Sequence, residues 1–304
     1  MTSASSAPSV SVVLSTFDGG RFLRAQLSSL LAQELRPAEL VVCDDGSSDD
    51  TWDILAAFAA MAPFQVRLHR NAMRMGSRRS FEKGIRLARS EVIALCDQDD
   101  VWRADKLAVT VQALELSGAP LAFCDAALVG RCEEPLGFGL WEAIGFSERM
   151  FPALADGSAA LRLLRQNVVT GCASAFWTRY RALLVPFSPR WIHDYWIAVV
   201  LAIVGNLRPI PAPLLSYRQH GANQIGVDLE ALRQRRVSPW RGANQDGSPF
   251  HESLTPDALA DLRLHLSALL EAPGAARLDD AARARATRLV QRLSDAVPAH
   301  STRT

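Results

Sequence analysis

Short apolar runs alternate with helix-like stretches along the first 130 residues. Apolar and β-branched residues form five strand-like runs, at residues 10–17, 40–43, 64–69, 92–95 and 121–129. Between them, apolar residues recur at helical spacing in residues 21–33, 80–89 and 105–117, and the polar cluster at residues 49–51 is typical of the start of another helix. Strands and helices that alternate with short connections predict an α/β fold, with a mostly parallel sheet and helices on both faces.

The second half of the chain is less regular. Residues 130–157, with Pro135 and the glycines at 137, 139 and 145, are predicted to be a loop or flap and not a core element. The elements expected after it are a short helix (159–165), a strand (168–177), an apolar helix that begins after Asp194 and two short strands (207–210 and 214–218). The composition changes after Gly226, and helices are expected from Thr255-Pro256-Asp257 and at 279–296. We therefore expect a flexible tail at 1–8, an α/β domain at 9–230, and a linker with a packed C-terminal helical extension at 231–304.

Composition and charge narrow the classes of protein to consider. A hydrophobic content of 49% supports a sizeable core, and a net charge of +1 gives no reason to expect a nucleic acid partner. Five cysteines without a CxxC pair are typical of reduced, buried thiols. The N-terminus lacks the features of a signal peptide, and the longest apolar run, residues 197–204, is far shorter than the roughly 20 residues of a membrane span. We expect a cytoplasmic protein, and peripheral contact with the inner face of the plasma membrane stays open.

Acidic residues follow two of the predicted strands. Asp97, Asp99 and Asp100 come directly after residues 92–95, in the stretch EVIALCDQDDVW, and Asp44 and Asp45 follow residues 40–43. In an open α/β sheet, ligands bind at the carboxyl ends of the strands. Crowded carboxylates need a cation, strong donors or full solvation. Taken alone, the stretch is explained equally well by a divalent metal that carries phosphates and by a solvated turn that caps the next helix.

Two later residues favour the metal–phosphate interpretation. Asp194 lies just before an apolar helix and His220 follows the last predicted strand. Their simpler explanations are a helix N-cap and a surface histidine in a turn. There is no GxGxxG after the first strand and no Walker-type lysine, so a dinucleotide or an NTPase phosphate is not expected. The acids and these two residues together predict a metal–diphosphate site.

Three segments resemble inverting family 2 glycosyltransferases of the GT-A fold. They are VSVVLSTFDGGRFLRAQLSSLLAQ, ELVVCDDGSSDDTWDIL and ALCDQDDVWRADKL. The DQDD-Val-Trp form, with the later HDYW and YRQHG, is most similar to the bacterial rhamnosyltransferase branch, and the likeness covers roughly residues 9–226. Phe17 stands where this group usually has tyrosine and Ser80 where asparagine commonly precedes the phenylalanine, which leaves fine specificity open.

The resemblance implies a role for individual residues. The residues expected to bind the nucleotide sugar are Ser15, Thr16, Phe17, Asp44, Asp45, Asp97 and Gln98. Asp99 and His220 are the expected metal ligands, for Mn²⁺ or Mg²⁺, and the imidazole of His220 suits Mn²⁺ better. Asp194 is the expected general base, which takes the proton of the acceptor hydroxyl. His193 is expected to be structural, and Arg74 is explained equally well by a diphosphate contact and by a solvated basic face.

The function implied is metal-dependent, inverting transfer of a sugar in cell-surface polysaccharide biosynthesis. The resemblance implies a dTDP- or UDP-sugar as donor, with dTDP-rhamnose favoured by the likeness to the rhamnosyltransferase branch, and a saccharide or a lipid-linked sugar as acceptor. Two other classes stay open. A nucleotidyltransferase that makes a sugar nucleotide would carry a glycine-rich basic loop after the first strand, and residues 15–21 are a poor match. A non-catalytic nucleotide-sugar-binding protein would bind the nucleotide without turnover.

Overall fold

The structure is a computed structural model that describes residues 7–221, 225–226, 232, 241–242, 255–271 and 278–296. Most of the N-terminal tail predicted at residues 1–8, and the domain boundary predicted near residue 230, lie outside the described residues.

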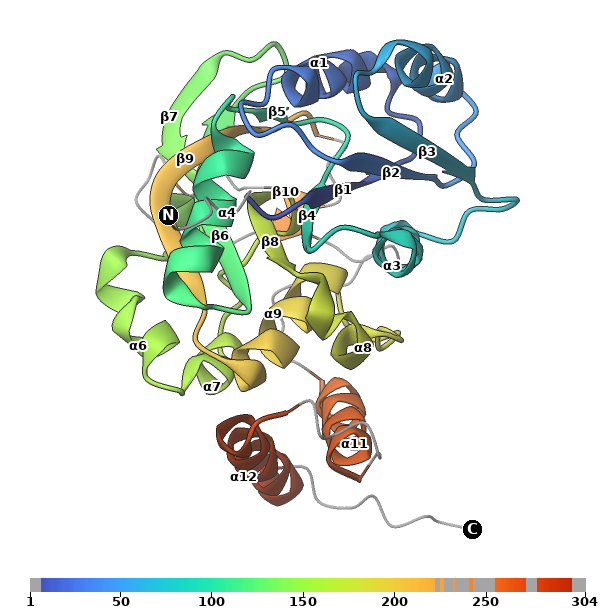
Figure 1. Ribbon diagram of the computed structural model, residues 1–304. Helices are drawn as coiled ribbons and strands as arrows, with labels where there is room; N and C mark the ends of the chain where they lie inside the picture. Colours follow the sequence, from blue (N-terminus) through green and yellow to red (C-terminus); the bar gives the residue numbers. More distant parts are fainter. Residues whose placement is uncertain are drawn as a thin grey trace, which may run out of the picture.

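The first half of the chain forms the parallel part of the sheet. Its strands lie side by side in the order β3-β2-β1-β4, all parallel, and they are β1 (Val10–Thr16), β2 (Glu39–Asp44), β3 (Gln65–Arg70) and β4 (Val92–Cys96). The connecting helices are α1 (Gly20–Leu31), α2 (Thr51–Met61) and α3 (Ser77–Leu87). Figure 1 shows α1 and α2 over one face of these strands and α3 over the other. The parallel strands with a helix after each of the first three confirm the α/β prediction. Strands β1, β2 and β4 are buried on both faces, which accounts for their apolar sequences.

The second half of the sheet is mixed. Strand β8 (Ser174–Trp177) runs antiparallel to β4 on one side and to β6 (Leu121–Val129) on the other. Beyond β6, strand β9 (Arg208–Arg218) runs parallel to it and carries two register shifts. The short strands β5 (Val101–Trp102) and β7 (Pro135–Gly139) pair antiparallel with β9 and β6. The predicted strand at 168–177 is therefore shorter than expected, and the two strands predicted at 207–218 form one.

The flap predicted at residues 130–157 is wrong, because this region contributes to the core. It contains β7, α5 (Leu140–Ala143), a 3₁₀ turn (Glu148–Met150) and α6 (Pro152–Ala155). Trp141 and Phe146 are buried and meet edge to face, with ring centroids 4.9 Å apart, and Phe123 and Phe151 complete the aromatic cluster. Elements of about one turn are too short to show a hydrophobic period, so the sequence pattern was that of a loop.

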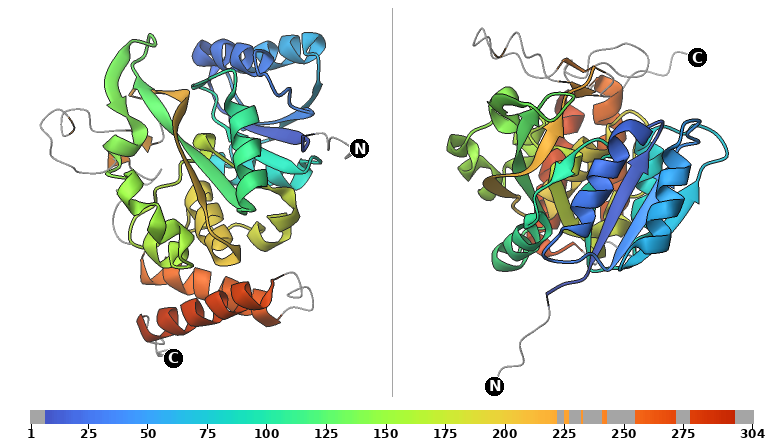
Figure 2. Two further views of the ribbon diagram at one scale, coloured as in Figure 1. Left: turned by 60° about the vertical axis from the view of Figure 1, so that its left-hand side comes forward. Right: turned by 90° about the horizontal axis from the view of Figure 1, so that it is seen from above.

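The remaining helices surround the mixed half. They are α4 (Lys106–Ser117), α7 (Ala159–Leu163), α8 (Arg181–Leu184), α9 (His193–Val204), α11 (Pro256–Glu271) and α12 (Asp280–Ala296), with 3₁₀ turns at Gly171–Ala173 and Thr178–Tyr180. Figures 1 and 2 show α11 and α12 as a pair beside α9. Trp191 Nε1 donates to the Ala258 carbonyl over 2.9 Å, and Arg285 Nε donates to the Ile203 carbonyl over 2.7 Å. The two C-terminal helices are thus attached to both ends of α9.

In the part of the chain that the structure describes, none of the helices combines the length and apolar character that crossing a bilayer requires.

Candidate active site

A cavity of about 650 Å³ lies at the carboxyl ends of β1 and β4 and reaches the start of α9. Most of the residues predicted for the site line it, namely Ser15, Thr16, Phe17, Asp45, Asp97, Gln98, Asp99, Asp194 and His220. Residues far apart in the sequence therefore meet in one place, as expected at the edge of an α/β sheet. Asp44 is the one predicted site residue that does not line the cavity.

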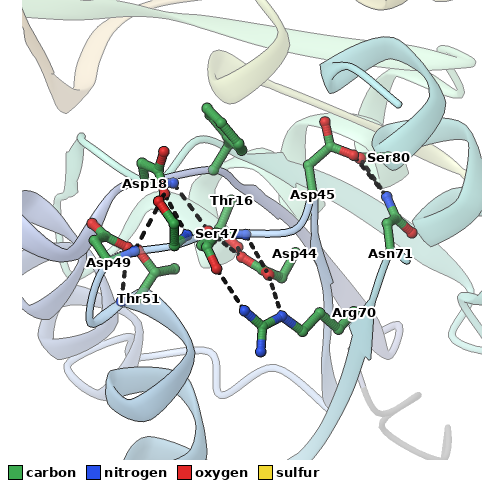
Figure 3. A network of polar contacts seen from close by, with 12 residues as sticks. Thr16, Asp18, Asp44, Asp45, Ser47, Asp49, Thr51, Arg70, Asn71 and Ser80 are labelled. Atoms are coloured by element: carbon green, nitrogen blue, oxygen red, sulfur yellow. Dashed lines mark hydrogen bonds and ion pairs between the residues drawn. The ribbon is translucent and has the colours of Figure 1, made fainter. Parts of the chain in front are cut away.

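Asp44 lies behind the cavity wall and supports it. Its carboxylate is fully buried, accepts hydrogen bonds from Thr16 Oγ1 (2.9 Å) and the Ser47 amide (3.1 Å), and lies 3.5 Å from Arg70 Nε. Figure 3 shows this carboxylate enclosed by Thr16, Ser47 and Arg70. A buried carboxylate requires such partners, because burial penalises the charged form. Asp44 thus joins the ends of β1 and β2.

Asp45 holds the loop between β3 and α3 at the edge of the cavity. Its two oxygens accept hydrogen bonds from the backbone amides of Met75 and Gly76, each over 2.7 Å, and from Asn71 Nδ2 over 2.9 Å. Gly76 has φ = 86°, a conformation that glycine adopts without strain. The loop places the guanidinium of Arg74 4.0 Å from the centre of the Phe17 ring, at the cavity.

Gln98 connects the ends of β1 and β4. Its Oε1 accepts from the Phe17 amide over 2.8 Å, and its Nε2 donates to the Phe17 carbonyl over 3.0 Å. The side-chain amide reproduces the two hydrogen bonds of a strand pair at a point beyond the end of β4. Gln98 therefore fixes Phe17 at the cavity wall.

Asp99 and His220 form the part of the site that could hold a metal. His220 Nε2 lies 2.8 Å from Asp99 Oδ2, and the imidazole stacks on Phe22 of α1 with ring centroids 4.6 Å apart. Arg218 Nε donates to the Asp99 backbone carbonyl over 2.7 Å, which fixes the turn that carries the acid. A carboxylate oxygen and an imidazole nitrogen this close, at the cavity wall, fit a cation such as Mn²⁺.

Asp97 and Asp100 complete a group of acids beside this pair. Burial, reinforced by the charges of Asp99 and Asp194, raises the pKa of Asp97 to about 7. Asp100 is buried, its pKa is also raised by burial, and its Oδ1 accepts from the Arg218 amide over 3.3 Å. Such crowding is the condition in which carboxylates bind a divalent cation.

The thiol of Cys172 lies close to Asp97 and Asp100, with potential ligand atoms of the three residues within 4.8 Å of one another. Burial raises the pKa of this thiol well above its usual range. Because the thiolate is the form that binds metal, a protonated Cys172 is a hydrogen-bond partner of the acids and a poor ligand.

Asp194 enters the cavity from the first turn of α9. Its Oδ2 accepts from the Gly171 amide over 3.0 Å, its Oδ1 accepts from the Tyr195 amide over 2.6 Å, and the side chain is buried. Burial raises the pKa of this carboxyl to about 6, although both hydrogen bonds lower it. A carboxylate held in place with a pKa near neutrality has the properties of a general base.

The structure also places residues at the cavity that were not predicted from the sequence. Phe22, Arg131, Thr170, Gly171 and Tyr217 line it, and so does Arg74, which the sequence left undecided. Phe22 has the spacing of an ordinary helix-core residue, and Tyr217 that of an inward-facing strand residue, so neither carries a sequence signal of its own. Gly76, close to Arg74 in the sequence, indicated a turn. It did not indicate that this turn faces a ligand site.

Comparison with known proteins identifies the family. Residues 11–183, more than half of the chain, match the protein family described as Glycosyl transferase family 2. The chain is 27% identical over 251 residues to the uncharacterized glycosyltransferase alr2836 of Nostoc sp., a match that covers 81% of this chain and 75% of the relative. It is 25% identical over 203 residues, 66% of this chain and 72% of the relative, to UDP-Glc:alpha-D-GlcNAc-diphosphoundecaprenol beta-1,3-glucosyltransferase WfgD of Escherichia coli.

A solved structure supports the fold assignment. The mannosyltransferase PcManGT of Pyrobaculum calidifontis, in complex with GDP-Man and Mn²⁺, superposes with a TM-score of 0.54 at 18% identity, over 96% of this chain and 76% of that one. At this identity the likeness concerns the fold alone. The chain therefore belongs to glycosyltransferase family 2 and is a glycosyltransferase with a GT-A-like fold.

Proposed function

We propose that this protein transfers one sugar from a nucleoside-diphosphate sugar to an acceptor hydroxyl, with inversion and with a divalent cation. The observation that carries the proposal is that Asp194, Asp97 and the Asp99–His220 pair line one cavity. A base with a raised pKa and a group of acids suited to a cation are the two components that transfer from a diphosphate leaving group requires.

Asp194 accepts the proton of the acceptor hydroxyl as its oxygen attacks the anomeric carbon. The bond between that carbon and the diphosphate oxygen breaks on the opposite face, which inverts the configuration. The Gly171 and Tyr195 amides keep the carboxylate in position for this step. Asp99 and His220 would hold the cation, with Asp97 beside them, and a bound Mn²⁺ or Mg²⁺ would neutralise charge on the leaving diphosphate.

The nucleotide binds, in this proposal, between Phe17 and the loop that Asp45 holds. Arg74 already lies over Phe17 from that loop, so a positive charge is available to the diphosphate. Gln98 fixes the backbone amide of Phe17, and Asp45 fixes the amide of Gly76 in the loop, before any ligand binds. A site formed in advance loses less conformational freedom on binding.

For the donor we propose dTDP-rhamnose or UDP-glucose. The DQDD-Val-Trp and HDYW segments support the first, and the name of the Escherichia coli relative, a UDP-Glc-dependent glucosyltransferase, supports the second. That name also supports a lipid-linked saccharide as acceptor in cell-surface polysaccharide biosynthesis, with the enzyme at the inner face of the plasma membrane. Arg288 and Arg292, exposed on α12, are available to anionic lipid headgroups there.

The test is turnover by purified protein. Release of dTDP or UDP is measured with each donor, with Mn²⁺, with Mg²⁺ and with EDTA, and the anomeric configuration of the product is read by NMR. We expect release that depends on the cation and a product of inverted configuration. Retention of configuration, or full activity in EDTA, would contradict the proposed mechanism.

A further inference from the structure

The segment 72–79, which joins β3 to the first turn of α3, carries two exposed apolar side chains. Met73 is 74% exposed and Met75 is 39% exposed. Among the described residues, the other large apolar side chains that are exposed lie singly on four different helices, at Leu31, Met61, Leu116 and Leu264. A single exposed apolar residue is normal, whereas two in one short loop beside a cavity indicate a contact surface.

The backbone that carries the two methionines is held on both sides of Met73. The Asn71 amide donates to the Asp44 carbonyl over 2.8 Å. The amides of Met75 and Gly76 donate to the Asp45 carboxylate, each over 2.7 Å. The exposure of the methionines is therefore a property of a fixed loop and not of a slack chain.

The same segment is strongly basic. Arg74, Arg78 and Arg79 lie within it, and the sequence has no acidic residue from position 71 to position 80. The next acid along the chain, Glu82, forms an ion pair with Arg86 over 2.8 Å. The pKa of Arg78 is lowered by burial and by the positive charge of Arg79 beside it, so neighbouring charges repel one another here. An anionic surface would relieve this repulsion.

The segment borders the candidate active site. Arg74, Gly76 and Ser77 line the cavity, and a methionine stands on each side of Arg74 in the sequence. Figures 1 and 2 show the loop between β3 and α3 projecting from the molecule. A lipid-linked acceptor keeps its lipid in the bilayer while its saccharide reaches Asp194, so the bilayer must lie close to the cavity. A basic loop with exposed apolar side chains beside the cavity meets this requirement.

We propose that the segment 72–79 docks the protein on a bilayer that contains anionic lipid, with its two methionines in the interface and its arginines facing the headgroups. Apolar side chains that enter the interfacial region and arginines near anionic headgroups both add to membrane affinity. The inference rests on the proposed function for its lipid-linked acceptor. It goes beyond that function by placing a lipid contact at the cavity, whereas Arg288 and Arg292 lie on α12.

The test is sedimentation of the full chain with vesicles, without nucleotide or acceptor. Vesicles of phosphatidylcholine are compared with vesicles that also contain phosphatidylglycerol. We expect the wild type to bind the anionic vesicles, and to bind them more weakly in high salt, since salt screens exposed charges. The double variant Met73→Ser/Met75→Ser should partition into them about tenfold more weakly, because two apolar side chains no longer enter the interface. Arg79→Gln should lower the partition about fivefold.

The matched control is Met61→Ser. Met61 is 69% exposed, so the substitution removes a comparable apolar side chain. Met61 ends α2 shortly before β3 begins, whereas Met73 follows the end of β3, so the two methionines lie at opposite ends of that strand. Met61→Ser should bind both kinds of vesicle as the wild type does. Every variant should keep the melting temperature of the wild type, because exposed side chains contribute little to stability.

Two results would overturn the inference. In the first, the methionine double variant binds anionic vesicles within twofold of the wild type, including the case in which only Arg288→Gln/Arg292→Gln lowers binding. In the second, the wild type binds neither kind of vesicle or binds both equally well. The vesicle assay contains no donor, so it is separate from the proposed function, which fails instead if the wild type releases no dTDP or UDP from any donor.

Discussion

Replacing Asp194 by asparagine keeps the shape of the side chain and removes its charge and its ability to take up a proton. As the proposed base, Asp194 contributes a factor of about 10² to 10⁴ to the rate. We therefore expect Asp194→Asn to lower kcat by that factor at pH 8. The affinity for the nucleoside diphosphate should stay the same, because the side chain acts on the acceptor.

The same substitution has a calculable effect on stability. The pKa of Asp194 rises from its ordinary value of 3.8 to about 6 on folding, so the folded state holds its proton to higher pH than the unfolded chain. The unfolded state then binds fewer protons, and stability falls as pH rises from about 4 to about 6. Above that range the ionised carboxylate costs the folded state about 3 kcal/mol.

Asparagine lacks this cost but accepts only one of the two amide hydrogen bonds, a loss of about 1 kcal/mol. Asp194→Asn should therefore be more stable than the wild type by about 2 kcal/mol at pH 8. Its advantage should be smaller at pH 5, by about 1.4 kcal/mol, because the wild-type carboxyl is then largely protonated. Urea unfolding at the two pH values measures the difference.

The control is Asp125→Asn. Burial also raises the pKa of Asp125, which accepts from the Trp141 amide over 2.9 Å and does not line the cavity. Its asparagine variant should show the same sense of pH-dependent stabilisation and unchanged turnover. The reasoning is refuted if Asp194→Asn turns over within a few-fold of the wild type, or if its advantage in stability is equal at pH 5 and pH 8.

Three further predictions concern the rest of the site. Asp99→Asn should weaken Mn²⁺ binding at least tenfold, and unchanged binding measured by electron paramagnetic resonance would remove Asp99 from the ligand set. Asp45→Ala leaves the amides of Met75 and Gly76 without their acceptor, so both should lose protection in hydrogen exchange, and UDP or dTDP affinity should fall about tenfold; intact protection at both would show that Asp45 does not hold the loop. Of the five thiols, Cys132 alone is exposed, so an aromatic disulfide reagent should modify one thiol per native chain and five after unfolding; a second fast thiol would contradict the burial of the others.

The sequence predicts the parallel half of the fold well and the mixed half poorly, for a physical reason. Strands β1, β2 and β4 are buried on both faces, and β1 to β4 follow one another through helices, so their pattern is local. Strand β8 pairs between β4 and β6 and runs against both, a non-local choice that no spacing within residues 168–177 reveals. The one-turn elements between residues 140 and 155 are likewise fixed by packing of Trp141 and Phe146, and not by a local period.

The candidate site shows the same limit. Acids at the ends of two strands do not by themselves indicate a ligand site, because such acids also cap turns and helices; the prediction depended on Asp194 and His220 as well. The sequence does not show that Asp44 turns inward to Thr16, whereas Asp45 holds a loop. Nor does it show that the side-chain amide of Gln98 both accepts a hydrogen bond from the Phe17 amide and donates one to the Phe17 carbonyl. The direction of a side chain at a strand end depends on the hydrogen bonds that it makes to the neighbouring loops. The conformation of those loops is determined by contacts between residues far apart in the sequence.

The attachment of α11 and α12 to α9 has a consequence for how acceptor choice can change between relatives. The segment that matches the family ends at residue 183, before Asp194 and His220. The helix that carries Asp194, the proposed base, is held at its start through Trp191 and at its end through Arg285. The half that matches the family and the half that carries Asp194 can therefore be exchanged as blocks only if the C-terminal helices are kept with α9. A chimaera joined between β8 and α9 without those helices would carry the proposed base on an unsupported helix.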